Sequence, residues 1–216
     1  MEVIQLKERD CQSWLLQKHY LKRVPTIAVA FGLVLEDKIE AVATFSGAVA
    51  RFELSHNPYE LSRLVANEGL PSNRLSWFLS RCIKQFPKST ILVSYADENW
   101  GHHGYIYQAT NWIYTGRSSG EKRIWIDGVE THRRTLYSRF GTSSIPKLKE
   151  QGYQIEFDEQ VGKHRYFQVT GDKRQRKKLR AEILSKYKQL PYPKGDNKRY
   201  DSGEDIHKEV FKNPFW

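Results

Sequence analysis

The stretch "SNRLSWFLSRCIKQFPKSTILVSYAD", residues 72–97, decides the fold class of this 216-residue chain. Its first half carries apolar side chains at the spacing of one helix face, namely Leu75, Phe78, Leu79, Cys82, Ile83 and Phe86. Pro71 and Ser72 are good signals for the start of that helix. The unbroken apolar run at 91–93 is typical of a strand that is covered on both faces of its sheet. A helix that leads into a buried strand predicts an α/β fold.

The segments upstream extend this pattern. Asp10 caps a predicted helix over 11–20. Strands over 26–35 and 39–47 are expected to form a hairpin, and a further strand follows over 58–66.

Downstream, the patterns alternate again between helix and strand. We expect a helix over 101–114, a strand over 121–128, a hairpin of 152–157 with 163–170, and a basic helix over 172–190. The complete order favours a mixed α/β (α+β) sheet with helices on both faces.

The length and the hydrophobic content of the chain favour one domain with an extension. Residues 1–190 are expected to form that domain, which ends in the basic helix, and 191–216 lack periodicity and form an extended tail. We expect no export signal and no membrane-spanning segment, so the predicted location is the cytoplasm. Cys11 and Cys82 fall at apolar helix positions and are expected to be buried thiols.

The net charge of +10 is concentrated in the second half of the chain. Residues 163–199 hold 13 Lys or Arg against 3 Asp or Glu, whereas residues 1–116 are almost balanced, with 12 against 11. Aromatic side chains lie inside the basic block, and they are Tyr166, Phe167, Tyr187 and Tyr192. Cations that meet phosphates beside rings that stack on bases indicate a nucleic acid, although a solubilising basic tail is the alternative.

Residues 94–116, "SYADENWGHHGYIYQATNWIYTG", carry an unusual number of polar-tipped rings. On a helix over 101–114, one face would present His103, Tyr107, Asn111 and Tyr114, and another Tyr105, Gln108 and Trp112. Asp97 ends the preceding strand, at the edge where open α/β sheets bind ligands. We therefore predict Asp97 as general base or orienting group and Tyr107 as proton donor. The alternative for Asp97 is a helix cap.

Metal binding is considered for the two histidines of this block. Adjacent histidines on a helix point about 100° apart, so His102 and His103 are not expected to share one ion with Asp97. No metal ligand is assigned, and whether catalysis needs a metal stays open.

Six segments together resemble the Mom family of phage DNA-modifying proteins. They are "HYLKRVP" (19–25), "ELSRLV" (60–65), "GLPSNRLSWFLSR" (69–81), the 94–116 block, "KHRYFQ" (163–168) and "LPYPK" (190–194). The resemblance implies a GNAT-like fold, that of an acyltransferase superfamily, and makes 1–190 a catalytic domain. It also implies a bacteriophage transferase that converts N6 of adenine in double-stranded DNA to a methylcarbamoyl-type adduct, which protects the DNA from host restriction.

Site residues follow from the matched motifs. The resemblance assigns catalysis to His19, Tyr20, Asp97 and Tyr107, and it places Glu60 and Arg63 in the "ELxR" strand. Paired adenine is out of reach, so the base must be flipped and stacked on rings such as Trp100. The predicted substrate contacts are Tyr105, Asn111, Trp112, Arg133, Arg134, Lys177 and Lys178.

The predicted donor is acyl-CoA or another acyl or amino-acid-derived compound, contacted by Arg63, Ser72 and Asn73. The stretch 63–73, "RLVANEGLPSN", departs from the usual CoA turn because it has one glycine, a proline and the acidic Glu68. Two other functions stay open. One is a GNAT-like transferase that acts on RNA or protein amines, and the other is a DNA-binding protein without enzymatic activity.

Overall fold

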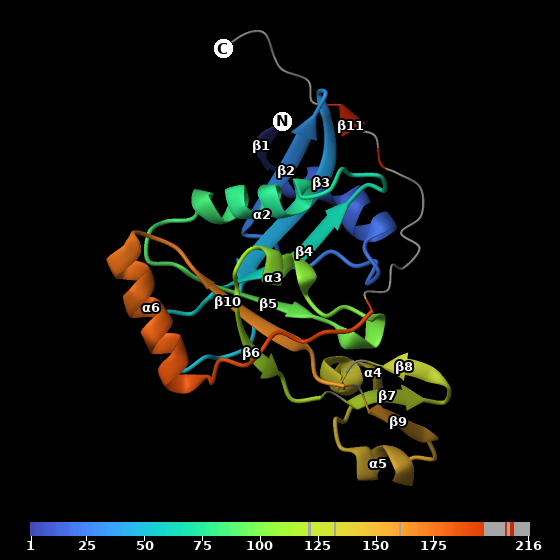
Figure 1. Ribbon diagram of the computed structural model, residues 1–216. Coiled ribbons are helices and arrows are strands. Elements are labelled where there is room, and N and C mark those ends of the chain that lie inside the picture. Colours follow the sequence, from blue (N-terminus) through green and yellow to red (C-terminus); the bar gives the residue numbers. More distant parts are fainter. Residues whose placement is uncertain (121, 132, 160, 197–205, 207, 210–216) are drawn as a thin grey trace.

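The computed structural model describes residues 1–120, 122–131, 133–159, 161–196, 206, 208 and 209. Within these residues, an eight-stranded mixed sheet forms the body, and a three-stranded sheet projects from one end of it (Figure 1). The strands of the large sheet are β1 (Glu2–Leu6), β2 (Val29–Leu35), β3 (Lys38–Gly47), β4 (Tyr59–Ala66), β5 (Ile91–Ala96), β6 (Ile113–Arg117), β10 (His164–Val169) and β11 (Lys208–Glu209).

The order of the large sheet is β1-β2-β3-β4-β5-β10-β6, and β11 pairs with β3. Strands β4 and β5 run parallel, whereas the other described neighbours are antiparallel. The predicted hairpin of β2 and β3 is confirmed. It turns through Glu36 and Asp37, whose φ angles of 48° and 60° lie in the left-handed region that tight hairpins require.

Helices cover both faces of this sheet, as predicted. Their bounds are α1 (Glu8–Ser13), the π-helix η1 (Trp14–Lys18), α2 (Arg74–Gln85), α3 (Tyr105–Ala109) and α6 (Lys173–Lys186). Phe78 of α2 packs in one cluster with Leu92, while Ile183 of α6 packs with Ile91 and Val93. Because successive strand residues point to opposite faces, α2 and α6 lie on opposite sides of β5.

The first helical segment belongs to the same side as α6. Trp14 of η1 packs with Val42 of β3, whereas the flanking Ala41 and Ala43 pack in the cluster with α2. Both cysteines are buried, as predicted. Among the described residues, none of the helices is both long and apolar enough to cross a membrane.

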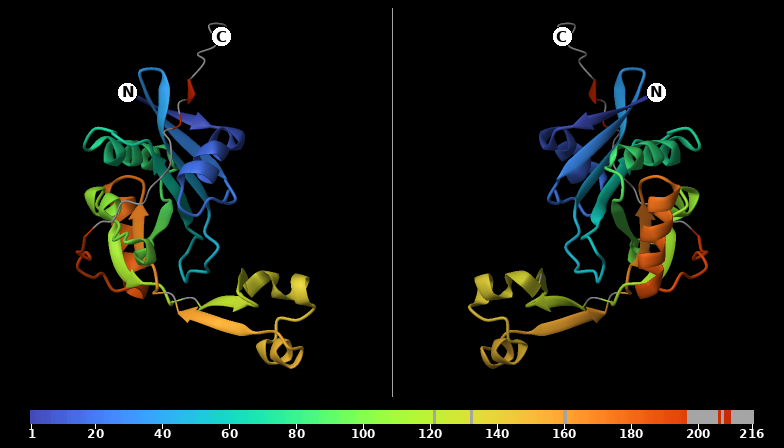
Figure 2. Two further views of the ribbon diagram at one scale, coloured as in Figure 1. Left: turned by 90° about the vertical axis from the view of Figure 1, so that its right-hand side faces the viewer. Right: turned by 90° about the vertical axis from the view of Figure 1, so that its left-hand side faces the viewer.

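The second sheet is formed by the chain between β6 and β10. Its order is β8 (Val129–Thr131), β7 (Lys122–Ile126) and β9 (Ile155–Glu159), and three short helices accompany it, namely η3 (Arg133–Thr135), α4 (Leu136–Phe140) and α5 (Ile145–Glu150). Its own small core consists of Ile124, Ile126, Leu136 and Leu148. Figure 2 shows this unit standing away from the large sheet, so we call residues 119–161 the projecting unit.

Two backbone segments join the projecting unit to the large sheet. The Ser118 N–H donates to the Lys163 carbonyl at 2.8 Å, and the Lys163 N–H donates to Ser118 Oγ at 3.1 Å. A Cβ at Gly162 would lie 1.8 Å from the Ser118 carbonyl oxygen. Only glycine therefore allows the two segments to approach so closely.

The helix predicted over 101–114 is wrong for most of its length. Gly104 has a φ of 76°, α3 covers only Tyr105–Ala109, and Asn111 turns the chain with a φ of 58° into β6. The β-branched and aromatic residues of β6 suit a strand, and β10 supplies its partner. His103, Tyr107, Asn111 and Tyr114 therefore do not share a helix face.

The predicted hairpin of 152–157 with 163–170 is also wrong. Strand β9 pairs with β7 in the projecting unit, whereas β10 inserts between β5 and β6. An alternating pattern identifies a strand, but it does not identify the partner.

The remaining helices follow the prediction more closely. Helices α2 and α6 are confirmed, and Asp172 caps α6 by accepting the Gln175 N–H at 2.9 Å. The first helix starts at Glu8, earlier than predicted, so Asp10 lies inside it and accepts the Lys7 N–H at 3.3 Å. The tail boundary at 190 stays a prediction, because most of the segment after 196 lies outside the described residues.

Candidate active site

The parallel strands β4 and β5 separate towards their carboxyl ends. Their register joins them at Tyr59 with Leu92 and at Glu60 with Val93, and the rest of each strand continues without the other. Ligand sites in open α/β sheets lie where neighbouring strands diverge in this way. The side chains around this opening are therefore the first candidates for an active site.

Four rings cluster at the opening. The Tyr20 ring lies 4.3 Å from His19, 5.0 Å from Trp100 and 5.4 Å from His102, measured between centroids. His19 ends η1, while Trp100 and His102 belong to the loop that follows β5. Trp100 is 39% exposed, so this cluster offers a ring surface to solvent on which a planar base can stack.

His19 lies beneath this surface as a neutral, buried imidazole. Burial lowers its pKa to about 3, and the positive charges of Arg63 and His102 act in the same direction. The Leu21 N–H donates to His19 Nδ1 at 3.1 Å. A neutral ring that accepts at Nδ1 carries its proton on Nε2, so Nε2 is the hydrogen-bond donor of His19.

Strand β4 contributes a carboxylate and a guanidinium that lie near each other, Glu60 and Arg63. Burial raises the pKa of Glu60, although the nearby charges of Arg63 and Lys163 oppose the shift. Burial likewise lowers the pKa of Arg63, whose Nη1 donates to the Ser62 carbonyl at 2.6 Å while Nε is buried without a hydrogen-bond partner. Glu60 is thus a carboxylate whose charged form is disfavoured, as expected for a proton acceptor.

Asp97 caps the short helix that follows β5, which was the predicted alternative to a catalytic role. Its Oδ1 accepts the Asn99 backbone N–H at 3.1 Å and the Asn99 side-chain amide at 2.9 Å, at the start of η2 (Glu98–Trp100). Its Oδ2 lies 3.2 Å from Lys163 Nζ, and the residue is 4% exposed. Asp97 therefore holds the loop that carries Trp100 and His102.

Tyr107 reaches the opening from α3 and is buried there. Its hydroxyl lies 2.8 Å from Ser94 Oγ on β5, and its ring packs between Trp112 and Tyr166 at centroid distances of 5.2 and 5.1 Å. Burial raises the pKa of Tyr107 to about 12. In this arrangement the phenol bonds to the sheet, and its role as proton donor stays a prediction.

The predicted substrate residues do not form one surface. Trp112 is buried in the core, and the Tyr105 hydroxyl donates to the Gly195 carbonyl at 2.5 Å. Ser72 and Asn73 are exposed at the start of α2. Arg133 is exposed on the projecting unit, and the Arg134 side chain lies outside the described residues.

A wide basic groove lies between α2 and α6. Its volume is about 1100 Å³, and its cationic lining residues are Lys84, Lys88, Lys173, Arg176, Lys177 and Arg180. Asn111 also lines it, whereas Lys178 is exposed outside the lining. The groove borders Thr170 near the start of β5, so the length of that strand, roughly 20 Å at 3.3 Å per residue, separates it from Asp97.

Sequence reasoning gave no role to several groups near the site. Lys163 and His164 were matched only as part of "KHRYFQ", and Glu98 was not considered. Their positions at the start of a strand and directly after Asp97 were available signals, but pairing β10 with β5 was needed to bring the segments together.

Comparison with known proteins adds three findings. The profile of the Mom protein family matches residues 1–194. The protein named methylcarbamoylase mom from Escherichia phage Mu is 27% identical over 161 residues, which cover 69% of this chain and 62% of the phage protein. A crystal structure of histone acetyltransferase HPA2 and related acetyltransferase from Corynebacterium glutamicum is similar with a TM-score of 0.47 and 8% identity, over 79% of this chain and 96% of that one.

Proposed function

The chain belongs to the Mom protein family, and on this premise we propose that it is a transferase that places a methylcarbamoyl-type group on N6 of adenine in double-stranded DNA. The name of the phage Mu relative supports the group transferred. The observation that carries the proposal is the ring cluster of His19, Tyr20, Trp100 and His102 above two poorly exposed carboxylates, Glu60 and Asp97.

Adenine is recognised after it leaves the duplex. Its N6 is hydrogen-bonded in paired DNA, so the enzyme has to flip the base into the opening between β4 and β5. Tyr20 and Trp100 supply a stacking surface, and such stacking contributes about 1–3 kcal/mol per base. Most of the cations that would hold the DNA backbone come from the second half of the chain.

The transfer forms one bond and breaks another. The N6 nitrogen attacks the carbonyl carbon of an activated methylcarbamoyl-type donor, the leaving group departs with the electron pair of its bond, and N6 loses one proton. Glu60 accepts this proton, because its raised pKa makes it a better base than an exposed carboxylate. His19 Nε2–H and Arg63 donate to the carbonyl oxygen as negative charge develops there. Asp97 orients the loop and Lys163.

Coenzyme A is not fitted by the loop between β4 and α2. Pro71 has no N–H to offer and Glu68 adds negative charge, and both features are unfavourable for binding a pyrophosphate. The proposed donor is therefore an activated acyl-type compound, and its contact with Ser72 and Asn73 stays a prediction.

Nucleoside mass analysis of DNA from bacteria that express the full chain tests the proposal. We expect a new adenosine species with the mass of a methylcarbamoyl adduct, absent from cells that express the Glu60→Gln variant at equal protein level. Unaltered DNA together with modified RNA or protein would support the transferase on other amines. Salt-sensitive DNA binding without any modified nucleoside or protein would support a binding protein.

A further inference from the structure

The projecting unit of residues 119–161 is an appendage with a core of its own. The partly buried side chains around that core also come from the unit, and they are Phe140, Ile145, Tyr153 and Ile155. Among the described residues, its strands and helices pack chiefly against one another rather than against the large sheet. The unit is therefore not needed to cover the large sheet, and its exposed surface is available to a partner.

The base of the unit is attached to the candidate active site. The Asn99 side-chain amide donates to the Val161 carbonyl at 3.2 Å, and Lys163 Nζ lies 3.2 Å from Asp97 Oδ2. Asp97 and Asn99 belong to the loop that carries Trp100 of the ring cluster. The unit therefore starts at the edge of the large sheet where the flipped base is expected to lie.

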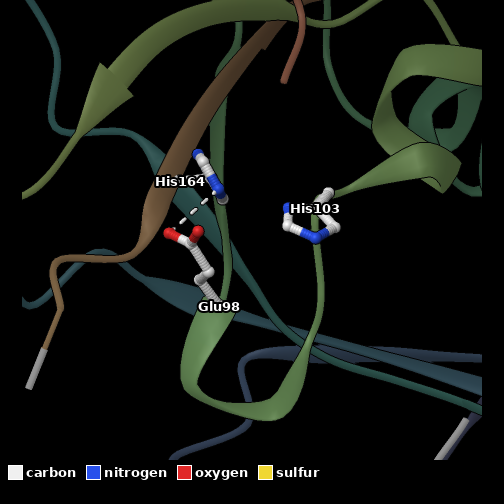
Figure 3. A group of neighbouring side chains, drawn as sticks. All are labelled: Glu98, His103 and His164. Carbon is white, nitrogen blue, oxygen red and sulfur yellow. Dashed lines mark ion pairs between the residues drawn. The ribbon is translucent and has the colours of Figure 1, made fainter. Parts of the chain in front are cut away.

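A second set of contacts fixes the same junction. Figure 3 shows Glu98, His103 and His164 as one cluster of neighbouring side chains. Glu98 Oε2 lies 3.5 Å from His164 Nε2 and 2.5 Å from Arg117 Nη2. Because β6 leads into the unit and β10 leads out of it, these contacts join both of its connections to the loop after β5.

Positive charge is concentrated on the helical side of the unit. Residues 133–149 hold five Lys or Arg and no Asp or Glu. The buried leucines of α4 and α5 pack with Ile124 and Ile126 of β7, so both helices cover that face of the small sheet. The exposed cations of this helical side are Arg133, Arg139, Lys147 and Lys149.

The opposite, open face of the small sheet is predominantly acidic. Trp125 of β7 pairs with Glu130 and Glu156, and Arg123 pairs with Asp158. Paired residues share a face, and side chains alternate along a strand, so this face is opposite to the small core. A polyanion is therefore attracted to the helical side and repelled by the open face, which restricts the orientation in which it binds.

One of the two helices lies towards the body of the molecule. Figure 2 shows α4 on the side of the unit nearer the large sheet and α5 on the side away from it. Tyr137 of α4 is 70% exposed, and Arg133 and Arg139 are exposed beside it in the sequence. Arginine and tyrosine side chains are common donors to the phosphates of a DNA backbone.

The size of the unit sets where it meets a duplex. Strand β7 has five residues, which at 3.3 Å per residue span about 17 Å. At 3.4 Å per base pair, this length corresponds to about five base pairs of DNA. A duplex whose adenine lies at the ring cluster would therefore reach α4 about half a helical turn away.

We propose that Arg133, Tyr137 and Arg139 form a docking surface for the backbone of double-stranded DNA, about five base pairs from the modified adenine. This inference rests on the proposed function for the identity of the nucleic acid. Phosphates are the same at every base pair, so the surface positions the duplex without reading its sequence. The basic groove lies at the other end of β5, whereas the unit adjoins the ring cluster, so the unit is better placed to hold the DNA that flanks the flipped base.

DNA binding by the full chain tests the proposal through two variants. Fluorescence anisotropy with a labelled duplex of several helical turns, repeated at several salt concentrations, gives the affinity and its salt dependence. Arg133→Ala should lower the slope of log K against log salt by about 0.9, the value for one phosphate contact. Tyr137→Ala removes no charge, so it should weaken binding about threefold to tenfold at an unchanged slope.

Lys149→Ala is the matched control, because it removes one exposed cation from α5 on the side away from the body. Its slope should stay close to that of the wild type. The proposal is overturned if Arg133→Ala or Tyr137→Ala binds as the wild type does, or if Lys149→Ala acts as strongly as Arg133→Ala.

Sedimentation and nucleoside analysis separate the remaining explanations. If Tyr137→Ala dissociates an oligomer and leaves DNA affinity unchanged, the surface binds a second copy of the chain and the proposal is overturned. Modified adenine with unaltered binding by both variants would sustain the proposed function and reject the docking surface. Weaker binding by both variants without any modified nucleoside in the wild type would sustain the docking surface and reject the proposed function.

Discussion

The Tyr107 hydroxyl and Ser94 Oγ lie 2.8 Å apart, directly where β4 and β5 separate. Ser94 Oγ also lies 3.0 Å from the Leu61 carbonyl of β4. A carbonyl only accepts, so the single Ser94 proton goes to Leu61 and the phenol of Tyr107 supplies its own proton to Ser94. This chain of two hydrogen bonds connects α3, β5 and β4.

Ser94→Ala should therefore destabilise the protein more than Tyr107→Phe does. The alanine leaves the buried Tyr107 hydroxyl without its partner, at a cost of about 1–3 kcal/mol. The phenylalanine keeps the bond from Ser94 to Leu61 and loses only about 0.5–1.5 kcal/mol. Urea unfolding of both variants measures the difference. The reverse ranking would mean that the hydrogen bonds do not run in this direction.

His19→Gln should flatten the acid side of the stability profile. The pKa of His19 is about 3 in the folded protein and about 6.5 for a solvent-exposed histidine, so the unfolded chain binds more protons as the pH falls below 6.5. The stability from neutral His19 is complete above pH 6.5 and is lost towards pH 3, with a slope of up to about 1.4 kcal/mol per pH unit. Glutamine does not titrate. Chemical denaturation at several pH values should show the smaller slope, and parallel curves would contradict the buried neutral ring.

Substituting Glu60 and Asp97 one at a time should distinguish the proposed proton acceptor from the residue that orients the loop after β5. Glu60→Gln removes the proposed proton acceptor and should abolish the modified nucleoside, because an amide cannot take the N6 proton. Asp97→Asn retains an oxygen for the Asn99 N–H and loses the ion pair with Lys163, so modification should fall but remain detectable. Nucleoside analysis at matched expression distinguishes them. Full modification by Glu60→Gln would move the base role to another group.

If DNA phosphates bind in the basic groove, removing cations from its lining should reduce the salt dependence of DNA binding. Replacing Arg176 and Lys177, which line the groove, by Ala should lower the slope of log K against log salt by about 1.8 if both contact phosphates. Arg174 and Lys178 lie on the same helix but do not line the groove. Replacing both by Ala removes the same amount of charge and should change the slope less. Equal effects of the two double variants would assign the contribution to net charge rather than to the groove.

The sequence predicted those elements whose signals are local. Helix α2 has a full apolar stripe, α6 has Asp172 and Gln175 at its start, and the hairpin of β2 and β3 has a short polar turn. Each of these depends on residues within about a dozen positions. The cap formed by Asp97 was foreseen as an alternative for the same reason.

The predictions that are wrong concern segments whose pairing partners lie far away in the sequence. Residues 113–117 carry both helical spacing and strand propensity, and pairing with β10 decides in favour of the strand. The cluster of Glu98, His103 and His164 likewise spans 66 positions and exists only because β10 lies beside β5. Periodicity within one segment contains no information about such a neighbour.

Because Ser118 and Lys163 are hydrogen-bonded to each other, β6 and β10 are already paired at the point where the chain enters the projecting unit. Residues 119–161 could be shortened, lengthened or exchanged for another module, and the strands on either side would still meet in register. Changes in the length or sequence of this unit should therefore leave the strands of the main sheet in place.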